Sequence, residues 1–101
     1  MKILIVTWLK EYLKDVARIF KQSNIDVFST NEITGHRNSA AANLLEDWFA
    51  SGGGDADSMM IFTFTPAANA ETGLELIKDH NKTTHADFPI RAFIMPVEKA
   101  V

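Results

Sequence analysis

The sequence predicts a single α+β domain in which two helices cover one face of a four-stranded antiparallel sheet, in the order β-α-β-β-α-β. Two observations lead to this fold. Apolar residues alternate with a period of two in four segments, and they recur at helical spacing in two segments that each follow a strand. The chain has 101 residues, which is enough for one modest core. We therefore interpret residues 1–101 as one domain.

The first half of the chain predicts a strand, a helix and a second strand. Lys2–Trp8 is rich in β-branched residues and apolar on both faces, which is typical of a central strand. Residues 10–22 carry apolar side chains at helical spacing. The inner stripe of this helix is expected to contain Leu9, Leu13, Val16 and Phe20, with Tyr12 and Ile19 beside it. The segment Ile25–Arg37 then alternates over an unusually long stretch, so its far end, Thr34–Arg37, is expected to project beyond the sheet.

The second half predicts a loop followed by a strand, a helix and a strand. Residues 36–57 form the loop, and within it residues 38–50 show a further helical signal that a run of glycines ends. Ser58–Thr65 predicts a strand, Asn69–Lys82 a helix and Phe88–Val97 the last strand. This order is that of the ferredoxin-like βαββαβ sandwich.

The predicted strands carry more apolar residues than two helices can cover. The first, third and fourth strands are apolar on both faces, and the uncovered face would leave Leu4, Val6, Met60 and Phe62, or the residues that alternate with them, in water. An exposed apolar patch of this kind favours aggregation unless another protein surface covers it. We therefore expect self-association through the open face of the sheet.

Composition excludes several classes of function. The net charge is -3 and the basic residues are scattered, so nucleic acid is not an expected partner. Cysteine is absent, which excludes disulfides and thiol chemistry. The apolar run near Met1 is too short for a signal peptide or a membrane span, so we expect a cytoplasmic protein. No nucleophile elbow occurs and the carboxylates fall mainly on helix exteriors, so the sequence predicts no enzyme and no catalytic residue.

The chain resembles the PII family of trimeric signalling proteins, which act in nitrogen regulation, over nearly its whole length outside the loop. The resemblance rests on the opening strand and helix, on Ile33-Thr34-Gly35-His36 where the family's second strand enters its loop, and on the ending Val97-Glu98-Lys99-Ala100. It implies a cytoplasmic homotrimer whose sheets line the centre, with small-molecule sites in the clefts between subunits. It also implies that the loop controls a protein target such as a transporter or an enzyme.

The resemblance places a ligand site at the base of the loop and after the second helix. The residues concerned are Gly35, His36, Arg37, Lys82, Thr83, Thr84 and His85. Gly35 can instead serve only to turn the chain, and His36 and Arg37 can equally be solvated surface residues. The segment 82–87 lacks the family's glycine-rich phosphate loop, and no RxR motif follows the last strand. The ligand and any cofactor therefore stay undetermined, with a small anion or a metal ion as the classes that fit.

The loop carries a cluster of large apolar residues. Leu44, Leu45, Trp48 and Phe49 can either pack on their own trimer or dock a protein partner, because tryptophan and phenylalanine are favoured anchors at interfaces. Glu46 and Asp47 beside them argue against a membrane surface, where such helices carry lysine and arginine.

A metal-handling function is the alternative. His36, His80 and His85 could supply imidazoles to a metal ion, although their spacing matches no compact metal motif. Such a protein would be similar to the trimeric divalent-cation tolerance family.

Overall fold

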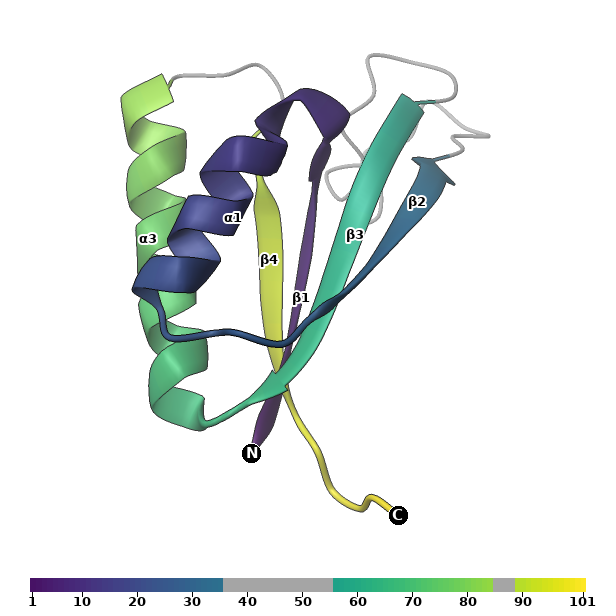
Figure 1. Ribbon diagram of the computed structural model, residues 1–101, viewed down its shortest axis with the longest axis vertical. Helices are drawn as coiled ribbons and strands as arrows, with labels where there is room; N and C mark the ends of the chain where they lie inside the picture. The colour runs from purple at the N-terminus through teal and green to yellow at the C-terminus, as the bar shows by residue number, and fades with distance from the viewer. Residues whose placement is uncertain (36–55, 85–88) are drawn as a thin grey trace, which may run out of the picture.

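The computed structural model describes residues 1–35, 56–84 and 89–101, and its elements follow the predicted order (Figure 1). The strands are β1 (Lys2–Leu9), β2 (Ser29–Gly35), β3 (Ala56–Thr65) and β4 (Arg91–Pro96), and the helices are the 3-10 turn η1 (Lys10–Tyr12), α1 (Leu13–Gln22) and α3 (Ala67–Thr84). Among the described residues, no helix is long and apolar enough to cross a membrane.

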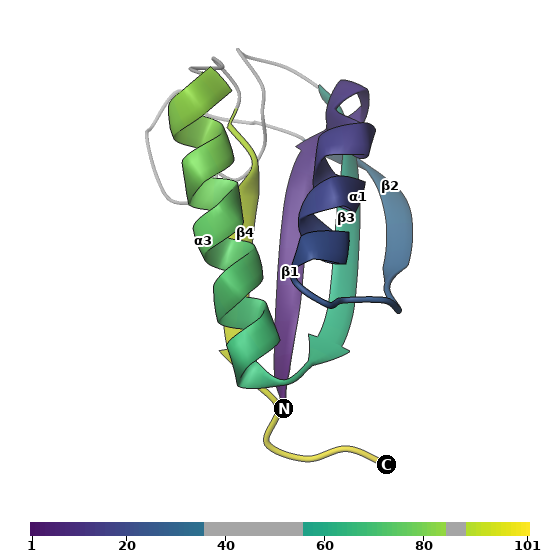
Figure 2. The same ribbon diagram turned by 60° about the vertical axis from the view of Figure 1, so that its left-hand side comes forward.

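The four strands form one antiparallel sheet in the order β2-β3-β1-β4. Both helices lie against the same face of this sheet, as the two views show (Figures 1 and 2). The prediction of a small α+β fold with a four-stranded antiparallel sheet and two helices is therefore confirmed, and the arrangement is compatible with a ferredoxin-like fold.

The core lies between β1 and the two helices. β1 is central, because it pairs with β3 on one side and with β4 on the other. Its even-numbered residues Leu4, Val6 and Trp8 are buried on the helix side. They belong to one cluster with Val16, Ile19 and Phe20 of α1 and with Ala70 and Ile77 of α3. Each large apolar side chain buried in this way contributes about 1.5–3 kcal/mol.

The second strand is shorter than predicted. β2 begins at Ser29 instead of Ile25, because Asn24 adopts a left-handed backbone conformation with φ of 59° and turns the chain out of α1. Ile25 then packs into the core at 4% exposure, and its N–H donates to the Phe20 carbonyl at 2.9 Å. Residues 25–28 are therefore a connection between helix and sheet.

The far end of β2 does extend past the middle of the sheet. The last pair between β1 and β3 joins Leu9 to Ser58, whereas β2 continues to pair with β3 as far as Gly35 and Ala56. The predicted projection of Thr34–Arg37 is thus confirmed for its described part, as a two-stranded extension. His36 and Arg37 lie outside the described residues.

The helices differ from the prediction in their faces and ends. The predicted inner stripe includes Leu13, but this side chain is 51% exposed, and Ile19 is buried in the core with Val16 and Phe20. Leu13 is the first residue of α1, whereas the buried residues Val16, Ile19 and Phe20 lie in its later turns. α3 begins two residues earlier than predicted, directly after Pro66, and β4 is confined to Arg91–Pro96. The helical signal at residues 38–50 lies outside the described residues.

The face of the sheet away from the helices is apolar over three strands. The register aligns Phe64, Ile3 and Met95 in one row and Phe62, Ile5 and Phe93 in the next. Phe64 is 55% exposed and Phe93 48% exposed, and the rings of Phe62 and Phe64 meet edge to face at 6.3 Å. We call these six residues the open-face patch.

The structure decides which of the two alternating sets of β1 reaches this face. Leu4 and Val6 are fully buried on the helix side. Ile3 and Ile5 reach the open face instead, because successive residues of a strand point to opposite faces. Met60 and Phe62 lie on the open face, as the sequence predicts.

Candidate functional site

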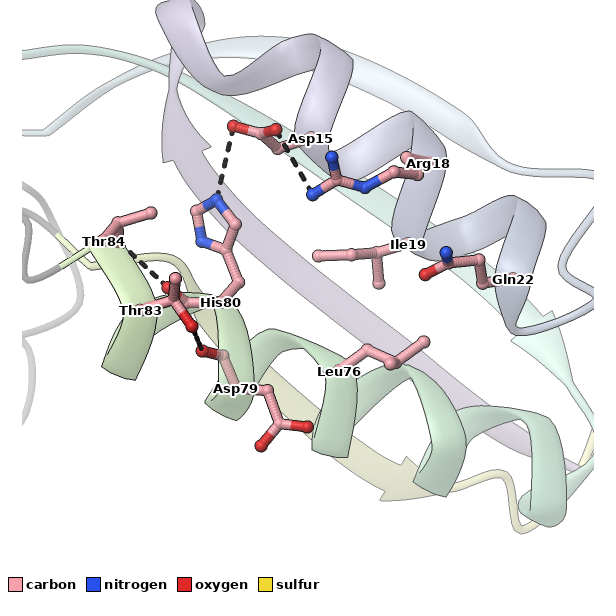
Figure 3. A pocket seen from close by; sticks show the side chains of 9 residues that line it. All are labelled: Asp15, Arg18, Ile19, Gln22, Leu76, Asp79, His80, Thr83 and Thr84. Atoms are coloured by element: carbon pink, nitrogen blue, oxygen red, sulfur yellow. Dashed lines mark hydrogen bonds and ion pairs between the residues drawn. The ribbon is translucent and has the colours of Figure 1, made fainter.

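A cleft between α1 and α3 is a candidate site in the part of the chain that the structure describes. Its volume is about 400 Å³ (Figure 3). The lining residues are Asp15, Arg18, Ile19 and Gln22 from α1, and Leu76, Asp79, His80, Thr83 and Thr84 from α3. Amphipathic spacing positions these groups, because the two helices pack their apolar stripes on the sheet and turn adjoining polar flanks toward each other. The result is a polar cleft with apolar side chains, Ile19 and Leu76, between its walls.

His80 is the most buried polar residue of the cleft. Its side chain is only 8% exposed, and its Nε2 lies 3.3 Å from Oδ2 of Asp15. The two atoms are close enough for an ion pair, but their angles do not fit a hydrogen bond. Neither ring nitrogen has a hydrogen-bond partner among the described residues. The ring of Tyr12 meets the imidazole edge to face at 6.1 Å. A buried polar side chain without hydrogen bonds is unusual, because each unpaired group costs about 1–3 kcal/mol.

Asp15 joins the buried imidazole to an exposed cation. Its second oxygen, Oδ1, lies 3.4 Å from the guanidinium of Arg18, one helical turn further along α1. Both of these side chains are more than a third exposed, so solvent screens their pairing and it contributes about 0–1 kcal/mol at most. Asp15 therefore presents one oxygen to Arg18 and one to His80 (Figure 3).

The end of α3 supplies two hydroxyl groups to the same cleft. Thr83 Oγ1 donates to the carbonyl of Asp79 at 3.0 Å, and Thr84 Oγ1 donates to the carbonyl of His80 at 3.0 Å. Their protons are thus used within the helix, and only oxygen lone pairs remain for a ligand. The carboxylate of Asp79 points away from His80 (Figure 3).

The structure brings together only part of the ligand site that the sequence predicts. Thr83 and Thr84 line the cleft, whereas Lys82 is exposed on the same last turn of α3 and does not line it. Gly35 is the last residue of β2, where it pairs with Ala56. The positions of His36, Arg37 and His85 lie outside the described residues. A site between subunits that includes these residues stays a prediction.

Sequence reasoning missed the role of α1 in the cleft. The sequence analysis assigns no role to Asp15 or Arg18, and it considers His80 only together with His36 and His85. The available signal was spacing, because His80 precedes Thr83 and Thr84 by three and four residues and so shares a helix face with them.

The other predicted sites cannot be placed. Leu44, Leu45, Trp48 and Phe49, the proposed partner-binding group, lie outside the described residues. Within the described ranges, no group of three or more His, Cys, Asp or Glu residues could hold a metal ion.

Comparisons with known proteins bear on the fold. No family model and no curated protein matches the chain. Among solved structures, the chain is similar to a crystal structure of a DUF3240 family protein from Shewanella baltica OS155, with a TM-score of 0.66 and 18% sequence identity. The match covers 99% of this chain and 92% of that chain. At this identity the similarity supports the small α+β fold and carries no function.

Proposed function

We propose that this protein is a PII-like regulatory protein: a homotrimer that senses a small ligand and controls a protein target, without catalysing a reaction. The observation that carries the proposal is the open-face patch of Phe64, Ile3, Met95, Phe62, Ile5 and Phe93. Large contiguous apolar patches on a folded domain mark surfaces that other proteins cover.

A second copy of the chain is the occupant that best fits this patch. The patch spans the central strand β1 and both strands that flank it, so only a broad apolar surface can cover it. The same face of another subunit is such a surface, and it offers aromatic rings for edge-to-face contact. A symmetric assembly buries the same residues in every subunit. The trimeric state itself is proposed from the resemblance to the PII family.

Ligand sensing is proposed from the cleft between α1 and α3. Its buried imidazole has no hydrogen-bond partner within residues 1–35, 56–84 and 89–101, and two residues of the predicted ligand site, Thr83 and Thr84, line it. The helices α1 and α3, which line the cleft, cover one face of the sheet (Figure 2), and the patch lies on the other face, so self-association through the patch leaves the cleft open. The threonine hydroxyls donate to their own helix, which supports a binding role over a nucleophilic one.

Paired charge substitutions test the assembly. Phe93→Glu places a carboxylate in the open-face patch, and Leu13→Glu places one on α1 at nearly the same exposure, 51% against 48%. An unpaired charge in a buried interface is costly, so Phe93→Glu should dissociate the assembly or make it insoluble, while Leu13→Glu should leave its mass unchanged. Light scattering that shows an intact assembly in both variants would refute this interface.

Metal handling remains a second candidate function because of the contact between His80 and Asp15. Metal-bound histidines commonly have a carboxylate beside the ring. A trace-metal scan of the purified protein tests this candidate, which requires stoichiometric copper or zinc.

A further inference from the structure

The two edges of the sheet differ in how far they are protected against pairing with another chain. At the β4 edge, Pro89 precedes the strand and Pro96 ends it, and proline hinders strand pairing because it lacks an N–H group. β2, at the other edge, contains no proline, lysine or arginine, and it pairs with β3 at seven consecutive positions without a bulge. Natural edge strands commonly carry one of these protective features. The β2 edge is therefore the one that is open to another protein segment.

The connection before β2 adds two exposed apolar side chains to this edge. Val27 is 83% exposed and Phe28 is 40% exposed. Both residues are fixed in place, because the Thr63 hydroxyl donates to the Val27 carbonyl and the ring of Phe28 meets that of Phe20 edge to face at 5.2 Å. Asp26 beside them is exposed and makes no ion pair with another described residue. We call Asp26, Val27 and Phe28 the β2 knob.

A hollow at the opposite edge of the sheet has complementary chemistry. It forms where the chain leaves β4, and its volume is about 630 Å³ (Figures 1 and 2). The lining residues are Met95, Pro96, Val97, Glu98 and Lys99. The first three give the hollow an apolar wall, and Lys99 supplies a positive charge that complements the carboxylate of Asp26. The hollow thus fits two apolar side chains that lie next to a carboxylate.

The β2 knob and the hollow lie at the same end of the sheet but at opposite edges. The strand order is β2-β3-β1-β4, so β2 and β4 are the two edges. Pro96, at the hollow, is in one row with Lys2 and Thr65, and the residue that holds the knob, Thr63, is two positions from that row. A contact between opposite edges of two copies is head to tail, and such contacts close into a ring when a rotation axis repeats them.

We propose that the β2 knob of one subunit inserts into the hollow of a neighbouring subunit, with Asp26 beside Lys99. This inference rests on the proposed self-association and adds a second interface to the open-face patch. The two interfaces are continuous, because Met95 belongs to the patch and also lines the hollow. In a trimer, each subunit offers its knob to one neighbour and its hollow to the other.

Disulfide cross-linking tests the contact, because the chain has no cysteine of its own. Val27→Cys and Glu98→Cys are made in separate chains, which are co-expressed and oxidised. The co-expressed chains should give a two-chain band on a denaturing gel, whereas each variant alone should run as single chains, since the contact joins unlike surfaces. Leu13→Cys replaces Val27→Cys in the control, because Leu13 is also exposed but lies on α1, and it should give no such band.

A charge exchange tests the pair of Asp26 and Lys99. Lys99→Glu and Asp26→Lys should each weaken the assembly about two- to fivefold, which is the range expected of an exposed ion pair. The double variant should regain the wild-type affinity, because it restores opposite charges. Lys14→Glu, at an exposed position of α1, is the control and should change nothing. Analytical ultracentrifugation measures all four, and a double variant weaker than both single variants would overturn the pairing.

Light scattering on the same samples separates this inference from the proposed function. An intact assembly without the cross-link would overturn the contact between knob and hollow and leave the open-face patch standing. Two-chain bands from Val27→Cys alone would show two knobs facing each other and would overturn the head-to-tail contact. A cross-linked protein whose mass survives Phe93→Glu would support the contact between knob and hollow and refute the patch.

Discussion

The side chain of Asn81 forms hydrogen bonds with both the N–H and the C=O group of Ile90. The side-chain Nδ2 donates to the Ile90 carbonyl at 2.8 Å, and the Ile90 N–H donates to Oδ1 of Asn81 at 3.0 Å. Ile90 is buried directly before β4, at the point where the chain returns from α3 to the sheet. One amide therefore takes the place of a strand partner and fixes where β4 enters the sheet.

Asn81→Ala should destabilise the fold by about 1–3 kcal/mol, because it leaves the N–H and C=O of Ile90 unpaired in a partly buried place. Asn69→Ala is the control, since the hydrogen bond that the Asn69 side-chain amide donates to the Asn24 carbonyl is long, at 3.4 Å, and exposed. That control should stay within about 0.5 kcal/mol of the wild type. Urea unfolding measures both, and equal midpoints for the two variants would contradict the role of Asn81.

Thr63 anchors the connection before β2 in a similar way. Its buried hydroxyl donates to the Val27 carbonyl at 2.6 Å. Thr63→Val keeps the shape of the side chain and removes the donor, so we expect a loss of about 1–2 kcal/mol in the free energy of unfolding. Thr30→Val, on the exposed edge strand β2, should be nearly neutral. A Thr63→Val protein as stable as Thr30→Val would show that the connection holds without this bond.

Gly73 lies inside α3 close to the core. A Cβ atom built there would meet Leu4 Cδ2 and Ser23 Oγ at 3.5 Å, which is ordinary van der Waals contact. Gly73→Ala should therefore stabilise the protein by about 0.5–1 kcal/mol, the usual helix-interior gain. Gly73→Leu should instead destabilise it by about 1–3 kcal/mol through overpacking. Thermal unfolding distinguishes the two, and a destabilised Gly73→Ala would mean that the helix and β1 pack more tightly than these distances indicate.

The helices and strands of this fold are predictable from the sequence because the spacing of apolar residues differs between a helix and a strand. The run at Lys2–Trp8, which is apolar on both faces, corresponds to the central strand β1. Helical spacing predicts an inner stripe of Ala70, Leu74 and Ile77 with Gly73 as a possible member, and the structure buries Ala70, Gly73 and Ile77 while Leu74 is half-buried. The spacing wrongly predicts a strand at Ile25–Phe28. Apolar and polar residues still alternate there, but the backbone forms hydrogen bonds with α1 and with the Thr63 side chain instead of a neighbouring strand. The spacing of apolar residues does not show which hydrogen-bond partner a backbone N–H or C=O group will have.

The cleft between α1 and α3 was also not predictable from the spacing of apolar residues. Asp15 reads as a solvent-facing residue of its own helix, and only the packing of α1 beside α3 brings it to His80. Contacts between helices depend on the crossing geometry, which a single-helix pattern does not contain. The sequence predicts that the uncovered face of the sheet is apolar. Only the register and the burial in the structure show that Ile3 and Ile5, and not Leu4 and Val6, belong to the open-face patch.

The solution mass of the wild-type protein tests the central claim, self-association through the open-face patch, most directly. Light scattering at micromolar concentration should give three times the chain mass of 11.3 kDa, the mass of the trimer that we propose from the resemblance to the PII family. A mass of two chains would keep the self-association and overturn the trimer. A clean, soluble monomer would contradict the account, since the apolar side chains of β1, β3 and β4 would then stand in water without a partner.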